Sequence, residues 1–177
     1  MTLTETSARH RRRLLRLSAG VCGLMLLAVL GGCGIGDAFR SGPVFSMEWV
    51  ALQASPDTNN DQPVAVDLVI LHQEELIERL EKLPASDWFD RKAQFARDFP
   101  KGFTIISWEL VPDQSIQARQ LTDEELESET GDRAVGAYVF ALYSTPGDHR
   151  ARVLTQRGIT IVLEEDTFFL QPYEPSS

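Results

Sequence analysis

Few of the side chains that usually carry catalysis stand close enough in the sequence to act together. The chain holds two cysteines and three histidines. His72 lies between a predicted strand and a predicted helix, beside Glu74 and Glu75. One imidazole with flexible carboxylates makes a poor metal site, so a partly exposed histidine is the better interpretation. His149 follows Asp148 in a predicted hairpin turn, and turn chemistry accounts for it.

Other motifs of enzymes and ion sites are missing from the sequence. There is no G-x-S-x-G, no H-E-x-x-H and no glycine-rich phosphate loop. Asp67 and Glu109 lie in predicted strands, where alternation would point both outward, so we do not pair them as acid and base. The acidic run 123–132 lacks the ligand spacing and central glycine of a calcium loop, which favours a solvated loop. We therefore expect no catalytic residue, no metal and no small-molecule substrate.

The first 33 residues form three zones that are typical of a secretory signal. An apolar run over residues 17–30 is shorter than the roughly 20 residues that a membrane-spanning helix needs. It ends in Leu30-Gly31-Gly32-Cys33, which resembles the lipobox of bacterial lipoproteins. The basic start of the segment contains Arg9, His10, Arg11, Arg12, Arg13 and Arg16.

The lipobox resemblance implies a signal peptide over residues 1–32, removed by cleavage before Cys33. It also implies a covalent diacylglycerol and an N-acyl chain on Cys33, with no other cofactor. Three chains exceed the two signals that stable membrane anchoring needs. Gly34 after the cysteine favours the outer membrane over inner-membrane retention. The arginine cluster leaves both the general secretory and the twin-arginine export route open.

The composition of the remaining chain excludes a nucleic-acid partner. The leader holds five of the 17 basic and one of the 26 acidic residues, which leaves 12 and 25 and a net charge of −13. Such a surface repels nucleic acid. Because Cys22 leaves with the leader and Cys33 is expected to be acylated, no thiol remains for a disulfide. The fold must then be stabilised by packing alone.

Periodicity predicts a mainly β domain over residues 44–177, after a flexible tether over residues 33–43. In the first strand, Phe45, Met47, Trp49 and Ala51 would share one face. Leucines at helical spacing and a second segment, capped by Ser86, predict a helical insertion at about 73–99. Thr122 with Glu125 predicts a helix start. The predicted strands are 44–54, 64–71, 103–111, 115–120, 135–144, 151–155, 159–163 and 167–170.

These elements predict a two-sheet β-sandwich of about eight strands with a helical insertion after the second strand. Residues 55–63 are an unbroken run of turn formers, too polar to be buried. Trp49, Trp88 and Trp108 are expected to pack in the core. Trp88 and Phe89 are adjacent at a helix start and cannot both face one core, so one of them should contact a sheet edge or a partner.

Four segments, in order, resemble the TssJ lipoproteins of type VI secretion systems. They are residues 55–66 (SPDTNNDQPVAV), 83–89 (LPASDWF), 110–114 (LVPDQ) and 137–143 (AYVFALY). The chain departs from the family pattern at Asp67 and Leu68, and at Asp113, where the family usually has glycine. The helical insertion and the acidic loop are also long, so the sequence resembles a divergent member.

This resemblance implies a transthyretin-like sandwich that assembles with other proteins rather than catalysing a reaction. It implies a place on the periplasmic face of the outer membrane and a TssM-like inner-membrane protein as partner. The loop that would bind this partner consists of Ser55, Pro56, Asp57, Thr58, Asn59, Asn60, Asp61 and Gln62. The alternatives are a lipoprotein scaffold or pilot for another envelope machine and, less favoured, a periplasmic hydrolase.

Overall fold

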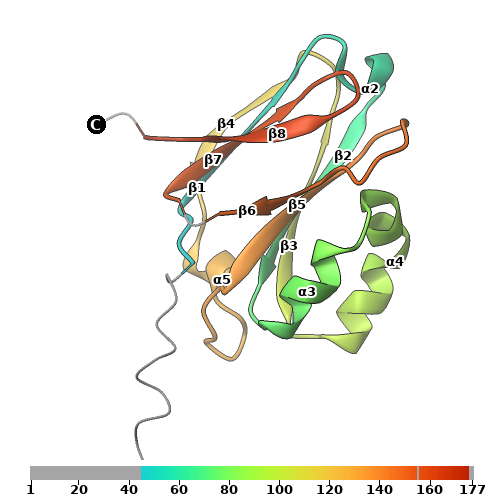
Figure 1. Cartoon of the computed structure of the whole chain (residues 1–177). Coiled ribbons are helices and arrows are strands. Elements are labelled where there is room, and N and C mark those ends of the chain that lie inside the picture. The colour runs from blue at the N-terminus through green and yellow to red at the C-terminus, as the bar shows by residue number, and fades with distance from the viewer. Residues whose placement is uncertain (1–44, 155, 176–177) are drawn as a thin grey trace, which may run out of the picture. The chain divides into compact units, whose positions relative to one another are not determined.

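The computed structural model describes residues 45–154 and 156–175, and these form a sandwich of two four-stranded sheets (Figure 1). The expected leader, Cys33 and the tether lie outside the described residues. Sheet A has the order β4-β1-β7-β8 and sheet B the order β3-β2-β5-β6. The prediction of a two-sheet sandwich of about eight strands is confirmed.

The strand bounds follow the hydrophobic alternation of the sequence. Within sheet A, β1 pairs in parallel with β7, and the other neighbours are antiparallel. Sheet B is antiparallel throughout. The strands are β1 (Trp49–Ala54), β2 (Val64–Leu71), β3 (Phe103–Leu110), β4 (Ser115–Gln120), β5 (Gly136–Leu142), β6 (Arg150–Val153), β7 (Gly158–Leu163) and β8 (Phe168–Pro172).

The alternating strand directions give the sandwich two different ends. The connections β1–β2, β3–β4, β5–β6 and β7–β8 all lie at one end, which we call the loop end. From Phe45 the chain enters β1 at the opposite end, which we call the tether end. The loop end is marked by the short turn α2 (Thr58–Asp61), whose last three residues have positive φ angles, and the tether end by the four-residue helix α5 (Asp123–Leu126) (Figure 1).

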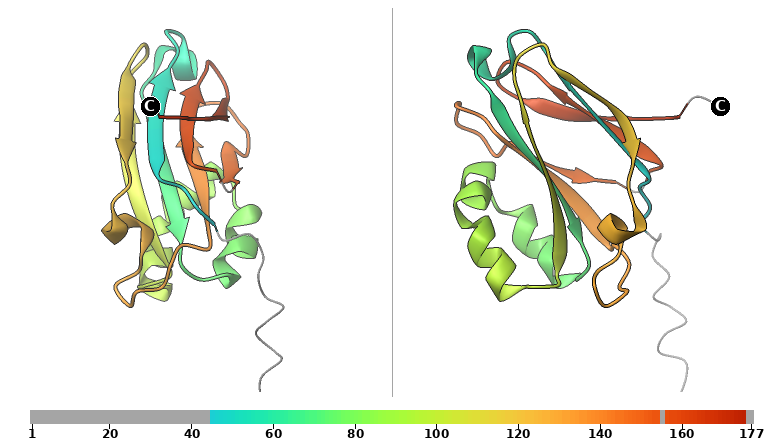
Figure 2. Two further views of the ribbon diagram at one scale, coloured as in Figure 1. Left: turned by 90° about the vertical axis from the view of Figure 1, so that its left-hand side faces the viewer. Right: turned by 180° about the vertical axis from the view of Figure 1, so that it is seen from behind.

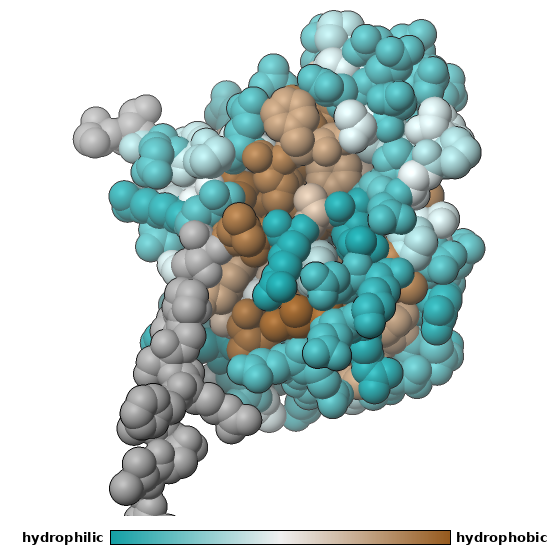
Figure 3. Space-filling model, viewed as in Figure 1, coloured by the Kyte–Doolittle hydropathy of each residue, from teal (hydrophilic) through white to brown (hydrophobic). Residues whose placement is uncertain are grey.

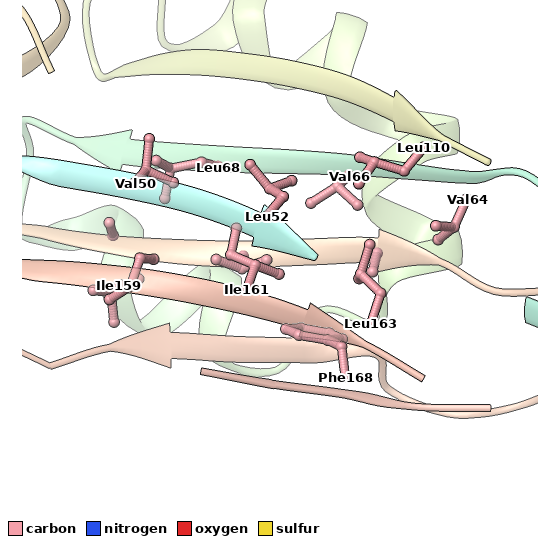
Figure 4. Packing of buried hydrophobic residues seen from close by; sticks show 14 of the residues in the cluster. Val50, Leu52, Val64, Val66, Leu68, Leu110, Ile159, Ile161, Leu163 and Phe168 are labelled. Carbon is pink, nitrogen blue, oxygen red and sulfur yellow. The ribbon is translucent and has the colours of Figure 1, made fainter. Parts of the chain in front are cut away.

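The main core fills the space between the two sheets (Figure 4). Val50 and Leu52 of β1 meet Val66 and Leu68 of β2, and all four are essentially inaccessible to solvent. Each such side chain contributes about 1.5–3 kcal/mol by burial. The prediction that Phe45, Met47, Trp49 and Ala51 share one face of the first strand is wrong, because the strand begins only at Trp49. Phe45 and Met47 do pack on the core, but they precede the strand, and Trp49 and Ala51 are not among the residues of this core.

A second core lies on the outer face of sheet B, beneath α3 (Glu75–Glu81) and α4 (Ala85–Asp98), as Figures 1 and 2 show. Trp88 is its centre, fully buried and stacked on Phe140 of β5 with ring centroids 5.0 Å apart. Phe89 is half-buried, with Lys92 4.7 Å above its ring. Because the helices cover this face, β2 is buried on both sides, which explains its nearly continuous apolar run.

Two predictions about this layer are wrong for identifiable reasons. Pro84, not Ser86, precedes the first turn of α4, and the Ala85 amide instead donates to the Asp148 carbonyl at 2.8 Å. Asp67 does point outward from sheet B, as alternation predicts, but it is 1% exposed, because α4 occupies the space where solvent was expected. It accepts hydrogen bonds from Trp88 Nε1 at 2.8 Å, Lys92 Nζ at 2.9 Å and Ser107 Oγ at 2.6 Å. The carboxylate therefore fixes α4 on the sheet.

Candidate functional site

The predicted partner-binding loop lies at the loop end and carries an unusual backbone conformation. Asn59, Asn60 and Asp61 have φ angles of 52°, 56° and 61°. Asn and Asp tolerate this left-handed region better than other residues with a side chain. The Asn-Asn-Asp sequence thus permits the tight path by which the chain leaves β1 in sheet A and enters β2 in sheet B.

Two buried polar side chains attach this loop to the body of the sandwich. Thr58 is fully buried, and its Oγ1 lies 2.8 Å from the Ser55 carbonyl oxygen and 3.0 Å from that of Leu163. Asn59 is 3% exposed. Its Nδ2 donates to the Pro63 carbonyl, and its Oδ1 accepts from the Ser144 amide, each at 2.7 Å.

The expectation that the whole segment is too polar to be buried is wrong for Thr58 and Asn59. Both side chains find hydrogen-bond partners, which offset the cost of removing them from water. The remaining side chains of the segment stay at the surface, and Ser55 is half-buried. The exposed residues are Pro56, Asp57, Asn60, Asp61, Gln62 and Pro63.

Neighbouring connections pack against this loop and widen the surface. In the β3–β4 turn, the Asp113 amide donates to the Ser55 carbonyl at 3.1 Å. In the β7–β8 connection, the Glu164 carbonyl accepts from the Asn59 amide at 3.3 Å. The Thr167 carbonyl of the same connection accepts from the buried Tyr143 hydroxyl, just after β5, at 2.5 Å. Burial raises the pKa of Tyr143 far above its ordinary value, so this hydroxyl stays a donor. Three connections from distant parts of the sequence are thus held side by side.

The surface formed by these connections is acidic. Residues 55–63, 111–114 and 164–167 contain six carboxylates and no lysine or arginine. A hollow of about 310 Å³ separates Ser55 and Asp57 from the three acids of the β7–β8 connection. Hydrophilic residues cover this end in Figure 3. The six acids are Asp57, Asp61, Asp113, Glu164, Glu165 and Asp166.

His72 and the acidic run lie apart from this surface, whereas His149 lies in the β5–β6 connection at the loop end and stacks on Tyr143. His72 is 7% exposed, so the expectation of a partly exposed ring is wrong; its Nε2 lies 3.0 Å from Thr104 Oγ1. Burial lowers the pKa of His72, and the nearby Asp132 opposes this shift. His149 is half-buried, and its Nε2 contacts the Thr145 carbonyl at 2.9 Å. Residues 45–154 and 156–175 contain no group of three or more His, Cys, Asp or Glu side chains that could hold a metal ion.

The acidic run forms ordered structure at the tether end. The predicted helix start is confirmed, since Thr122 and Glu125 form a capping box with the Thr122 amide 2.9 Å from Glu125 Oε2. Glu125 also pairs with both terminal nitrogens of Arg119, each at 2.9 Å. This contact is the largest cause that lowers the pKa of Glu125. Among the described helices, none combines the length and apolar character needed to cross a membrane.

Comparison with known proteins identifies the fold. The sequence matches no protein-family model and no curated protein. The structure of the type VI secretion lipoprotein TssJ1 from Pseudomonas aeruginosa aligns over 76% of this chain and all of its own, with a TM-score of 0.51 and 15% identity. The chain has a TssJ-like fold.

Two further solved structures resemble this TssJ-like chain. Serratia marcescens Lip, a membrane-bound component of the type VI secretion system, aligns with a TM-score of 0.45 and 14% identity over 73% of this chain and 99% of its own. A type VI membrane complex contains a chain that aligns with a TM-score of 0.49 and 14% identity. That alignment covers 70% of this chain and 96% of the other.

The sequence-based prediction assigned the candidate site to one loop and missed the two neighbouring connections that pack against it. One signal was present: three consecutive acids, Glu164 to Asp166, separate two predicted strands. No local feature of the sequence indicates that Asp113 lies near this loop, because its position depends on how the chain passes from β3 in sheet B to β4 in sheet A. The roles of Thr58 and Asn59 as anchors were also missed, since composition alone does not distinguish a buried Asn from an exposed one.

Proposed function

We propose that this protein is the lipid-anchored component of a type VI secretion membrane complex, and that it docks the periplasmic part of a TssM-like inner-membrane protein to the outer membrane. Its role is structural rather than enzymatic. The TssJ-like fold and the lipobox at Cys33 support this function together. The alternating strand topology adds a physical reason, because it separates the anchor from the docking surface.

The topology places the tether end and the docking loop, residues 55–62, at opposite ends of β1. The chain passes from the tether end through β1 directly to Ser55 at the loop end. Six strand residues span about 20 Å. The docking loop therefore lies away from the point where the tether joins the sandwich, and the tether does not obstruct access of a partner to it.

The anchoring of the docking loop is the observation that carries the proposal. Thr58 and Asn59 fix the backbone, and Asp57, Asn60 and Asp61 are presented outward. A preorganised loop loses little conformational entropy on binding, which favours affinity. The acidic side chains attract a basic partner surface and accelerate encounter with it.

Charge reversal at one exposed position tests this function without disturbing the anchors. Deleting residues 57–61 would remove Thr58 and Asn59 and damage the fold. Asp57→Lys changes an exposed side chain and removes one hydrogen bond, from Ser55 Oγ, while the bonds of Thr58 and Asn59 to Leu163, Pro63 and Ser144 remain; Asp90→Lys on α4 is the control. We expect co-purification of the TssM-like protein from native envelopes to fall about tenfold or more for Asp57→Lys, because a buried like charge costs well over 1.4 kcal/mol. Equal recovery with both variants would refute docking by this loop.

A further inference from the structure

The outer face of sheet A has no charged side chain in its strands. The strand register places eleven side chains and Gly158 outward from four neighbouring strands. About a quarter of all residues in the chain are charged, 24% in total, so the neutrality of this face is distinctive. The outward residues are Trp49, Ala51, Gln53, Ser115, Gln117, Gln120, Gly158, Thr160, Val162, Phe169, Gln171 and Tyr173.

Within the described residues the middle of this neutral face is open, and Tyr173 lies over Gly158 beside Trp49 at one edge of it. The view in the left panel of Figure 2 looks onto β4, β1, β7 and β8, and the end of β8 passes in front of β1. Sheet B, by contrast, has its outer face under α3 and α4. Phe169 is 38% exposed. Where the register of β4 shifts against β1, a groove of about 410 Å³ opens beside Gln53 and Gln117.

We propose that this neutral face packs against the same face of a second copy of the protein. The charge distribution argues for this occupant. The chain after the leader has a net charge of −13, so two copies repel each other across any acidic surface. The outer face of sheet A lets two copies approach without bringing like charges together.

The chemistry of the face is also complementary to itself. A glutamine amide carries both donors and an acceptor, so Gln53 and Gln117 can each bond an identical side chain across a two-fold axis. Phe169 and the Trp49–Tyr173 pair, whose ring centroids lie 6.2 Å apart, provide the apolar contact. Depletion of charge with retention of aromatic rings is the composition of an interface centre.

A two-fold axis parallel to the strands fits the anchored orientation. Both tether ends then face one membrane, and both loop ends remain free for a partner. The face measures roughly 20 by 19 Å, so the pair would bury about 800 Å² in total, less than the 1,200 Å² or more of stable interfaces. The contact is therefore weak in dilute solution and forms when lipid anchors confine the copies to a surface.

Cysteine cross-linking in native envelopes tests this contact on the full chain. Cys33 is the single cysteine after the leader, and when acylated it does not react with maleimides. Thr160→Cys places a thiol near the centre of the face, and Ser86→Cys on α4 is the control. With a short bis-maleimide, we expect a dimer of this chain from Thr160→Cys in several-fold excess over Ser86→Cys. Gln53→Cys replaces Thr160→Cys if the latter does not accumulate.

A charge placed on the face provides the second arm of the experiment. Gln53→Glu, combined with Thr160→Cys, should lower the dimer yield several-fold, whereas the exposed Gln73→Glu should not. Monomer alone, equal yields from the two cysteines, a product with a different protein, or a dimer that is insensitive to Gln53→Glu would overturn the proposal. None of these results bears on docking at the loop end, which is measured separately by co-purification.

Discussion

Asn59 offers a quantitative test of how the docking loop is held. Asn59→Ala removes both hydrogen bonds of the side chain and leaves the Ser144 amide and the Pro63 carbonyl without these partners. Each unsatisfied buried group costs about 1–3 kcal/mol. The left-handed backbone conformation of residue 59 destabilises the alanine variant by about 1 kcal/mol more. We therefore expect Asn59→Ala to lower the free energy of unfolding by about 3 kcal/mol, the lower end of this sum, because Pro63 and Ser144 are exposed residues and water can reach the freed groups.

A glycine variant separates the two parts of this cost. Asn59→Gly loses the same hydrogen bonds but accepts the φ angle of 52° without strain. It should be more stable than Asn59→Ala by about 1 kcal/mol. The assay is urea unfolding of the full chain in detergent, followed by tryptophan fluorescence. A loss below about 1 kcal/mol for Asn59→Ala, less than one unsatisfied group costs, or a glycine variant less stable than the alanine one, would refute this account of the loop.

Two further predictions concern the buried polar groups of sheet B. Asp67→Ala should lower the free energy of unfolding by about 3 kcal/mol. This is the lower end of the cost of breaking a buried ion pair, because the Lys92 side chain can turn to water. An equal effect from the exposed Asp90→Ala would contradict this explanation. Burial depresses the pKa of His72 in the folded state, so below about pH 6.5 the unfolded chain binds more protons at this residue. The stability that His72 contributes is present above that pH and is lost as the pH falls toward the folded pKa. His72→Gln should remove this part of the pH dependence, and identical urea midpoints against pH for both proteins would contradict it.

Local pattern was sufficient to predict much of the fold. The bounds of β2 and β4 agree with the prediction, because alternation and apolar runs there are bordered by proline and polar turns. The helical insertion follows β2, as the spacing of Leu76, Leu80 and Leu83 indicates. The capping box at Thr122 is likewise a property of adjacent residues.

The errors occur where a distant element decides the environment of a side chain. Asp67 is buried because α4, more than 15 residues later, covers its face of the sheet. His72 is buried although its neighbours in the sequence, Gln73 and Glu74, are exposed. Thr58 is buried because the Leu163 carbonyl of β7 reaches it across the loop end. The neutral outer face of sheet A emerges only from the register of four strands, of which β1 and β7 are more than 100 residues apart.

Photo-cross-linking from the docking loop in living cells tests the central claim most directly. A photoreactive amino acid at Asn60, which is exposed at the loop end, is compared with one at Gln94 on the outer side of α4. Docking by the loop predicts a covalent product with the TssM-like protein from position 60 and none from position 94. A product from position 94 with none from position 60 would contradict the proposed docking surface.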